Sequence, residues 1–265
     1  MYNLIWADFY KLSKSMAIKI LFAISTVSAV AMTAMAYLLP QGKISASMAG
    51  SGFMFSDVNI ISILGAVIAG VYICGDFDNK TIHDAIANGN SRGAVIVSKA
   101  MVFSCSIAFL LLPYAIITGI ALSTGFKFSM GSVAVGFLHL LTSNAGTAFS
   151  VATIGKLLVI MLTLMIVYVA QLIVCVPLAL VLKKPVLVVV IYYAFSIVCA
   201  NISALKNTSP IFDRIYACTP YGGNYSFLTL DTGVGDIFKA LFVSLIFMFV
   251  MIAVTYSAFR KSEIK

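Results

Sequence analysis

The side chains best suited to metal binding or proton transfer in this sequence are two histidines, His83 and His139. A zinc-binding helix needs a second histidine about three to five residues from the first, or a cluster of cysteines, and neither histidine has these neighbours. Four of the five cysteines fall within or at the edge of apolar runs, where we expect buried thiols. The sequence therefore predicts no metal site and no cofactor in this chain, and we interpret His83 with Asp84 as a polar pair on a helix.

Candidate nucleophiles and nucleotide-binding loops lack the neighbours that their chemistry needs. Ser143 and Ser150 have no flanking glycines, and the nearest histidine precedes both, which argues against a serine intramembrane protease. Gly155-Lys156 is followed by a leucine instead of Ser or Thr, and no upstream glycine completes a phosphate-binding loop. We therefore predict that this chain is not an enzyme. If ATP powers it, another protein binds the nucleotide.

The composition is that of a membrane protein. Hydrophobic residues make up 62% of the 265 positions and charged residues 10%, and the mean hydropathy is +1.07. Several apolar runs approach about 20 residues, which is enough for a helix to cross a hydrocarbon core of about 30 Å. The stretches between the runs are too short for a separate folded head, so we expect an all-α membrane protein with one transmembrane domain, residues 1–265.

Six apolar runs are predicted to be transmembrane helices. With six spans both termini lie on one side, and 11 of the 17 Lys and Arg residues then lie on that side. This asymmetry predicts a multi-pass protein of the cell membrane with both termini in the cytoplasm. Because the basic residues occur in ones and twos at the ends of runs, the net charge of +8 indicates topology and not nucleic-acid binding. The predicted spans are 18–39, 58–74, 100–124, 157–182, 185–204 and 237–259.

Residues 1–15 have the pattern of an amphipathic helix at the cytoplasmic membrane interface. Apolar residues recur at spacings of three and four, which places them on one helix face. We place Trp6, Lys11 and Lys14 at the level of the lipid headgroups, next to the bilayer. The predicted apolar face consists of Tyr2, Ile5, Phe9, Leu12 and Met16, and the predicted polar face of Asn3, Asp8, Lys11 and Lys14.

Two segments on the outer side are harder to assign. Residues 128–155 are uncharged and rich in Gly, Ser, Thr and Asn, and a seventh span there would move the basic C-terminal residues outside. We therefore predict an outer loop with an interfacial helix. Residues 206–236 carry aromatic residues around Pro210 and Pro220. This second segment is either a re-entrant hairpin in the outer leaflet or an ordinary outer loop.

Polar and small residues within the spans suggest packing contacts. Gln171 is the strongest polar group at depth and lies near the kink-forming Pro177, so it is either a helix-packing hydrogen bond or a substrate contact. The predicted span centres hold no ionisable side chain, which argues against an ion-coupled carrier. One face of the first span carries small residues that allow another helix to approach closely, within one subunit or across a dimer. These residues are Ser25, Ala29, Thr33 and Ala36.

The longest polar interruption is GDFDNKTIHDAIANGNSRGAVIVSK, residues 75–99. Residues 80–87 are compatible with a helix of about two turns that Asn-Gly-Asn ends, and Ser91 can cap the helix that follows. A partner that pushes on a short helix between two spans moves both spans. Polar residues there could bind such a partner, namely Asp76, Asp78, Lys80, His83 and Asp84.

This stretch resembles the type-2 ABC exporter permeases, in particular the compact branch linked to bacteriocin, lantibiotic and bacitracin immunity or peptide export. In that family an acidic residue ends the second span, a Thr follows five residues later, and Ser-Arg and a Lys lead into the third span. The matching residues here are Asp76, Thr81, Ser91, Arg92 and Lys99. The chain departs from the pattern in having Asp where Glu is commoner and in having Lys80 where Gly is frequent.

The resemblance implies the transmembrane subunit of an ATP-driven exporter in a prokaryotic membrane, which moves an amphipathic or antimicrobial peptide or another hydrophobic substrate. Two such permeases, identical or paralogous, would pair with two ATPase subunits that bind ATP and magnesium. Residues 75–99 would be the coupling loop, whose short helix docks in a cleft of the ATPase, and the N-terminal helix would brace it. The implied ATPase contacts are Asp76, Asp78, Lys80, Thr81, His83, Asp84 and Arg92, and the bracing residues are Trp6, Phe9, Lys11 and Lys14.

Two other classes of function fit the same residues. A structural or sensory membrane protein could bind a cytoplasmic partner through residues 75–99 without transporting anything. A standalone channel would conduct without an ATPase.

Overall fold

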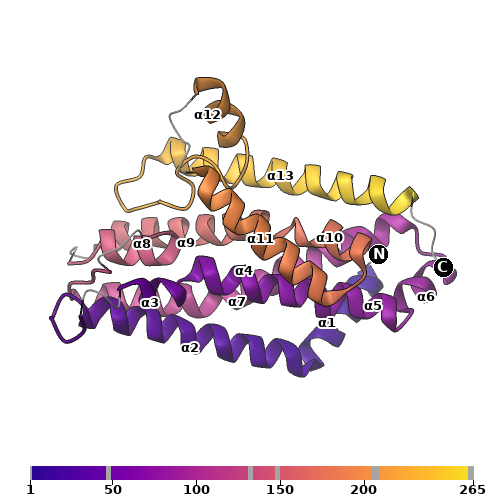
Figure 1. The fold of residues 1–265 in the computed structure, drawn as a ribbon, viewed down its shortest axis with the longest axis horizontal. Helices are drawn as coiled ribbons and strands as arrows, with labels where there is room; N and C mark the ends of the chain where they lie inside the picture. Colours follow the sequence, from indigo (N-terminus) through magenta and orange to yellow (C-terminus); the bar gives the residue numbers. More distant parts are fainter. Residues whose placement is uncertain (1, 46–48, 131–133, 147–149, 204–208, 262–265) are drawn as a thin grey trace.

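The computed structural model describes residues 2–45, 49–130, 134–146, 150–203 and 209–261, and every regular element in these ranges is helical (Figure 1). Six helical stretches are long and apolar enough to cross a membrane, which confirms an all-helical chain with six candidate spans. Because length and apolarity are local properties of the sequence, all six were predicted. The stretches are Met16–Leu38, Gly52–Asp78, Arg92–Ser123, Val151–Leu182, Pro185–Ile202 and Val234–Arg260.

Three of the spans form the core of the bundle. The most apolar windows of the second, third and fourth spans are 61–67% buried, against 33% for the first span and 17% for the fifth and sixth. The core helices are α4 (Asp57–Ala69), α7 (Arg92–Ser123) and α9 (Val151–Leu172) with its continuation α10 (Cys175–Leu182). The outer helices are α2 (Met16–Leu38), α11 (Pro185–Ser203) and α13 (Val234–Lys261), and α2 and α13 lie on opposite sides of the core (Figure 1).

Short helices gather at the two ends of the bundle. At one end, here the α6 end, lie α1 (Tyr2–Lys14), α5 (Gly75–Asp78) and α6 (Thr81–Ala87), together with the start of α7 and the end of α13 (Figure 1). At the other end, here the α8 end, lie α3 (Ala49–Met54) and α8 (Gly136–Ser143). The last short helix, α12 (Pro210–Ala217), stands off the bundle beside α13.

Serine side chains cap three of the helices. Ser15, Ser91 and Ser150 each precede a helix and accept a backbone N–H from its first turn at 3.2 Å, which satisfies a donor that has no partner within the helix. The donors are Ala17, Ala94 and Thr153. The prediction that Ser91 caps the next helix is confirmed.

The predicted loop 75–99 is mostly helical. A π-helical turn, Gly70–Cys74, continues α4 into α5, and α7 begins at Arg92 instead of near residue 100. With 32 residues, α7 is about 48 Å long, so it extends well beyond a hydrocarbon core of about 30 Å. The polar residues of this loop therefore lie largely on extensions of the two membrane helices, as the Ser91 cap predicted for α7.

The small-residue face of α2 packs within the chain. Ser25, Ala29 and Ala36 are completely buried, and α2 packs against α7 and α4. The hydroxyl of Ser25 donates a hydrogen bond to the carbonyl of Leu110 at 2.6 Å. Of the two alternatives for this face, packing within one subunit is the observed one. The prediction of a dimer face at Ser25, Ala29, Thr33 and Ala36 is corrected accordingly.

Gln171 lies at a break between α9 and α10. Pro177 has no N–H to bond the carbonyl of Ile173, and the regular helix is interrupted at residues 173–174. Beside this break, the backbone carbonyl of Gln171 accepts the hydroxyl of Tyr221, and the Gln171 side-chain amide donates to the carbonyl of Pro220 at 2.9 Å. Gln171 therefore makes the packing contact that the sequence allowed.

The loop that meets Gln171 belongs to the predicted segment 206–236, of which residues 206–208 lie outside the described part of the chain. The ring of Tyr221 makes edge contacts with Phe195 of α11 and Phe247 of α13, at centroid distances of 5.4 and 6.2 Å. Phe247 is halfway along α13, about 20 Å from its first residue. The loop thus reaches deep between the helices, which favours the re-entrant alternative.

Residues 128–155 contain the short helix α8, which is buried within the protein. Phe137, Leu138, Leu140 and Leu141 are completely buried where α8 packs against α4, α7 and α9. Residues 131–133 and 147–149 of this segment lie outside the described part of the chain. The core helices therefore cover the four large apolar side chains of this short helix.

A buried carboxylate fixes the start of α8. Asp57, the first residue of α4, is fully buried, and its Oδ2 accepts the N–H of Phe137 at 2.9 Å and the hydroxyl of Tyr168. Gly136 has φ +64°, and a Cβ there would lie 2.0 Å from the Tyr168 hydroxyl and 2.1 Å from Asp57 Oδ2. This turn therefore requires glycine both for its backbone conformation and for space.

We expect Gly136→Ala to lower the free energy of unfolding by about 3 kcal/mol or more, because the new methyl group displaces Tyr168 and Asp57 from their hydrogen bond. Gly146→Ala is the matched control, since Gly146 also has a positive φ, +80°, but among the described residues no atom beyond its chain neighbours lies within 4 Å of its Cβ position. The control should lose about 1 kcal/mol. Unfolding of the purified protein in detergent measures both, and equal losses would contradict the crowded turn.

Candidate functional site

Four charged side chains from three helices meet inside the α6 end. The ammonium group of Lys99, from α7, lies 2.6 Å from Asp8 Oδ1 of α1 and also pairs with Asp76 Oδ2 of α5. The other carboxylate oxygen of Asp76 pairs with Lys11 of α1. We call Asp8, Lys11, Asp76 and Lys99 the charge cluster. Lys99 is its centre because it bridges two aspartates from separate helices.

The inner members of the charge cluster are almost completely shielded from solvent. The side chains of Asp8, Asp76 and Lys99 are 9%, 1% and 5% exposed, whereas that of Lys11 is 47% exposed. Burying a charge is costly unless it is paired and hydrogen-bonded, and here two aspartates balance two lysines. The hydroxyl of Ser98 donates to Asp8 Oδ2 at 3.0 Å, and the Lys99 ammonium group lies 4.5 Å from the centre of the Tyr72 ring.

Helix α6 is attached directly to this cluster. The hydroxyl of Thr81 donates to the carbonyl of Asp76 at 3.2 Å, and Ile82 is buried where α6 packs on α5 and α7. At the start of α7, the guanidinium of Arg92 donates to the carbonyls of Phe259 and Arg260 at the end of α13. Helix α6 therefore contacts the ends of the second and third spans, and α7 in turn contacts the end of the sixth.

The residues predicted as contacts of a partner fall into two groups. Asp78, Lys80, Thr81 and Asp84 are exposed, and His83 is half-buried, so these side chains line the accessible part of the α6 end. Asp76 and Arg92, in contrast, are taken up within the chain. The prediction that Asp76 contacts a partner is corrected, because both of its carboxylate oxygens bind lysines of this chain. Arg92 is half-buried against α13.

The backbone at Lys80 explains one departure from the family pattern. Lys80 has φ +56°, the left-handed conformation that glycine adopts without strain and other residues rarely adopt. It is the residue before α6, where the chain turns out of α5. A glycine, which is frequent at this place in the permeases that the sequence resembles, has the conformational freedom that the turn needs.

The N-terminal helix is rotated relative to the prediction. Asp8 of the predicted polar face is buried in the charge cluster, and Phe9 packs against the core. Tyr2, assigned to the apolar face, is 71% exposed and lies in one row with Trp6 and Tyr10, which are 60% and 65% exposed. Two tyrosines and one tryptophan on an exposed helix face fit the headgroup region of a bilayer.

The lysines of this helix lie in different surroundings. Lys14 is exposed, as expected at headgroup level, and its ammonium group lies 5.7 Å from the Tyr10 ring centre. Lys11 instead turns inward to Asp76. The helix rotation follows from these contacts, because pairing Asp8 and Lys11 with Lys99 and Asp76 requires the polar face to point at α5 and α7.

Sequence reasoning did not assign Asp8, Ser98, Lys99 or Tyr72 to the site. Lys99 was noticed as a motif residue and a topology signal, but its partners come from positions 91 and 23 residues away. A usable signal was present in the composition. The chain has only nine acidic residues. An aspartate in a short amphipathic helix, such as Asp8, and a lysine near the start of a span, such as Lys99, are therefore candidates for a buried pair.

Two other polar sites lie away from the α6 end. Burial lowers the pKa of the His139 imidazole below its ordinary value, and His139 Nδ1 lies 3.3 Å from the hydroxyl of Ser143 in α8. Among the described residues, no hydrogen bond or ion pair links His139 to a carboxylate. A cavity of about 360 Å³ lies beside α9 and α11 and is lined in part by Gln171, Tyr192 and Tyr221. Gln171 therefore faces a cavity as well as the loop that it binds.

Comparison with known proteins does not assign the chain. No protein-family model matches it, and no curated protein matches it. The functional interpretation thus depends on the geometry of the α6 end and on the resemblance of residues 76–99 to the exporter permeases.

We expect Lys99→Met to lower the free energy of unfolding by about 3–5 kcal/mol, because it leaves Asp8 unpaired and removes one partner of Asp76 while keeping the volume. Chemical unfolding in detergent measures the loss. Lys14→Met is the matched control in α1, and its exposed side chain should cost less than about 0.5 kcal/mol.

A rescue experiment separates charge from packing at this position. Adding Asp8→Asn and Asp76→Asn to Lys99→Met removes the uncompensated buried charges and should recover part of the lost stability. Equal stability of Lys99→Met and Lys14→Met would show that the bridge contributes nothing.

Proposed function

We propose that this chain is the membrane-spanning permease subunit of an ATP-driven ABC exporter, whose energy comes from a separate ATPase. In this proposal the α6 end faces the cytoplasm, and α6 is the coupling helix that docks in a cleft of the ATPase. The substrate is an amphipathic or antimicrobial peptide or another hydrophobic molecule, and the protein works in a prokaryotic cell membrane.

One observation carries the proposal: an accessible short helix sits on a buried ion-pair network that joins the ends of two spans. A coupling helix has to receive force from a partner and pass it to the membrane helices without bending away. Thr81 links α6 to Asp76, and Lys99 links Asp76 to α7 and α1. Such a bridge of short contacts moves as a unit, so a displacement of α6 tilts the second and third spans together.

The accessible surface of α6 supports a polar docking contact. Asp78, Lys80 and Asp84 are exposed around the helix, and His83 is half-buried beside them. Charges of both signs at the rim of an interface contribute mainly to orientation and to the rate of association. The apolar side of the helix, in contrast, is occupied by the buried Ile82. We therefore assign docking to Asp78, Lys80 and Asp84.

The cavity beside Gln171 supports an amphipathic substrate. Its wall combines an amide and tyrosine hydroxyls with apolar side chains such as Phe53 and Val58. Sites for small molecules commonly pair an apolar lining with a few polar groups that fix orientation. The volume, about 360 Å³, fits one or two side chains of a peptide and not the whole of it. A second permease, identical or paralogous, completes the pathway in this proposal.

We expect the double substitution Asp78→Asn and Asp84→Asn to lower ATP-driven export about tenfold, because it removes the negative docking groups of α6 without touching the charge cluster. The partner ATPase is first isolated by pull-down from native membranes, and transport and ATP hydrolysis are then measured in liposomes. Asp231→Asn is the matched control, since this aspartate is exposed near the α8 end. Its export should be unchanged.

The same reconstitution separates the alternatives. Substrate-stimulated ATP hydrolysis is expected of the exporter. A sensory or structural protein would bind its partner through α6 without such stimulation, and a channel would conduct in liposomes that contain no ATPase. Unchanged export by the double variant would contradict the assignment of α6 as the coupling helix.

A further inference from the structure

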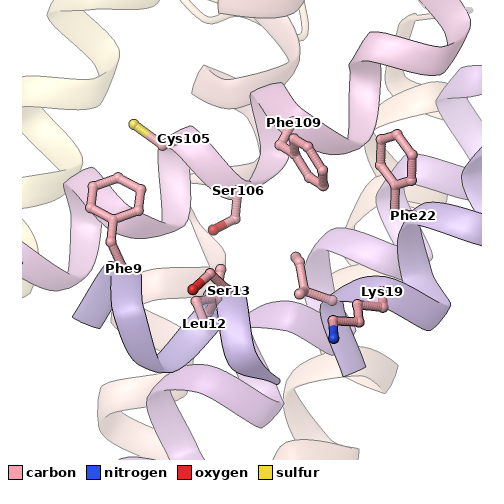
Figure 2. Close-up of a pocket in the computed structure, with 9 residues that line it drawn as sticks. Phe9, Leu12, Ser13, Lys19, Phe22, Cys105, Ser106 and Phe109 are labelled. Carbon is pink, nitrogen blue, oxygen red and sulfur yellow. The ribbon is translucent and has the colours of Figure 1, made fainter. Parts of the chain in front are cut away.

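A deep apolar groove lies where α1 and α2 meet α7, near the start of α2 (Figure 2). Its volume is about 520 Å³, and side chains from all three helices line it. Phe9 and Leu12 come from α1, and Cys105 from α7. At the α2 side, Phe22 stacks on Phe109 with ring centres 4.5 Å apart. The groove is therefore walled by apolar and aromatic surface.

One cation belongs to this groove. Lys19, the fourth residue of α2, lines it together with Ser13, and Figure 2 shows its ammonium group on the α1–α2 side, away from the Phe22–Phe109 pair. Among the described residues, no ion pair or hydrogen bond involves Lys19. A lysine near the start of a spanning helix lies at the depth of the lipid phosphates, where it needs an anion.

We propose that this groove is a binding site for an anionic phospholipid. Lys19 forms an ion pair with the phosphate of a headgroup that carries a net negative charge. One acyl chain lies along Phe9, Phe22 and Phe109. An apolar groove alone would accept any lipid chain, but the unpaired cation at its mouth selects for negative charge. This inference does not depend on the proposed transport function.

A second groove, between α2 and α7, provides an internal comparison. It lies nearer the α8 end, has a volume of about 410 Å³, and is lined by residues such as Val30, Tyr37 and Ile120. None of its lining residues is charged. The two grooves thus share helices and apolar character but differ in the lysine, so they predict different lipid preferences.

The position of the lipid gives it a structural role. Because the groove includes both α1 and α2, a bound acyl chain packs the N-terminal helix against the membrane helices that follow it. The same helix supplies Asp8 and Lys11 to the charge cluster. Anionic lipid and Lys99 therefore hold α1 through different side chains.

Fluorescence quenching by brominated lipids tests the proposal in the full chain. The sequence has one tryptophan, so Trp6→Phe with Phe109→Trp places a single reporter in the groove. We expect brominated phosphatidylglycerol to bind there about fivefold more strongly than brominated phosphatidylcholine with the same chains. Adding Lys19→Gln should abolish this preference, and Lys19→Arg should retain it.

Two controls keep the result specific. Lys156→Gln removes another lysine from the first turns of a spanning helix and should leave the preference unchanged. A reporter at Ile120→Trp, in the second groove, should show no preference between the two lipids. Native mass spectrometry of the unsubstituted protein should show retained phosphatidylglycerol that the Lys19→Gln variant loses. Equal quenching by both lipids at position 109, or a preference that survives Lys19→Gln, would overturn the proposal.

Discussion

The pairing of Lys99 with two aspartates is the contact on which the α6 end depends. Burying an ammonium group that is only 5% exposed is costly unless anions pair with it, and Asp8 and Asp76 supply these anions from two other helices. Asp8 belongs to the 13-residue α1, whose Leu4, Ile5, Phe9 and Leu12 also pack against the core, and Asp76 belongs to α5, which continues α4. The ion pairs add a directional contact that joins α1 to α5 and α7 beside α6.

A second buried carboxylate plays a comparable part at the opposite end of the core. Asp57 accepts hydrogen bonds from Tyr168 and from the backbone of Phe137, and this contact positions α8 between the core helices. The long helices between the two ends are held by apolar contacts of Leu, Ile, Val and Phe, which tolerate sliding. Directional contacts at both ends can fix the helices in one register. The polar contacts thus lie at the two ends of the core, and the apolar contacts lie between them.

Local patterns predicted most of the fold. Six spans follow from length and hydropathy, the start of α7 follows from the Ser91 cap, and the break at Pro177 follows from its missing N–H. The errors concern contacts between distant segments. The inward rotation of α1 needs Lys99, which lies 91 residues from Asp8, and the burial of α8 needs Asp57 and Tyr168. Helical periodicity cannot supply such partners, because it shows which residues share a face and not what that face meets.

The residues of the candidate site were also predicted only in part. The stretch around α6 stood out by its polarity, and Asp78, Lys80 and Asp84, which were predicted to contact a partner, are exposed there. Asp76 and Lys99 were recognised as motif residues, but their union with Asp8 and Lys11 in a buried cluster was not foreseen. The residue type alone does not distinguish an exposed aspartate from one that pairs with a lysine of another helix.

Hydrogen exchange of α1 is the measurement that tests the central claim most directly, namely that Lys99 holds this helix in place. Asp8→Asn weakens the bond of α1 to Lys99 while the pairing of Lys99 with Asp76 is retained. A 13-residue helix without its docking contact is marginal in water, so its amides should exchange much faster in the variant, while those of α2 stay protected. Unchanged protection of α1 in Asp8→Asn would contradict the account.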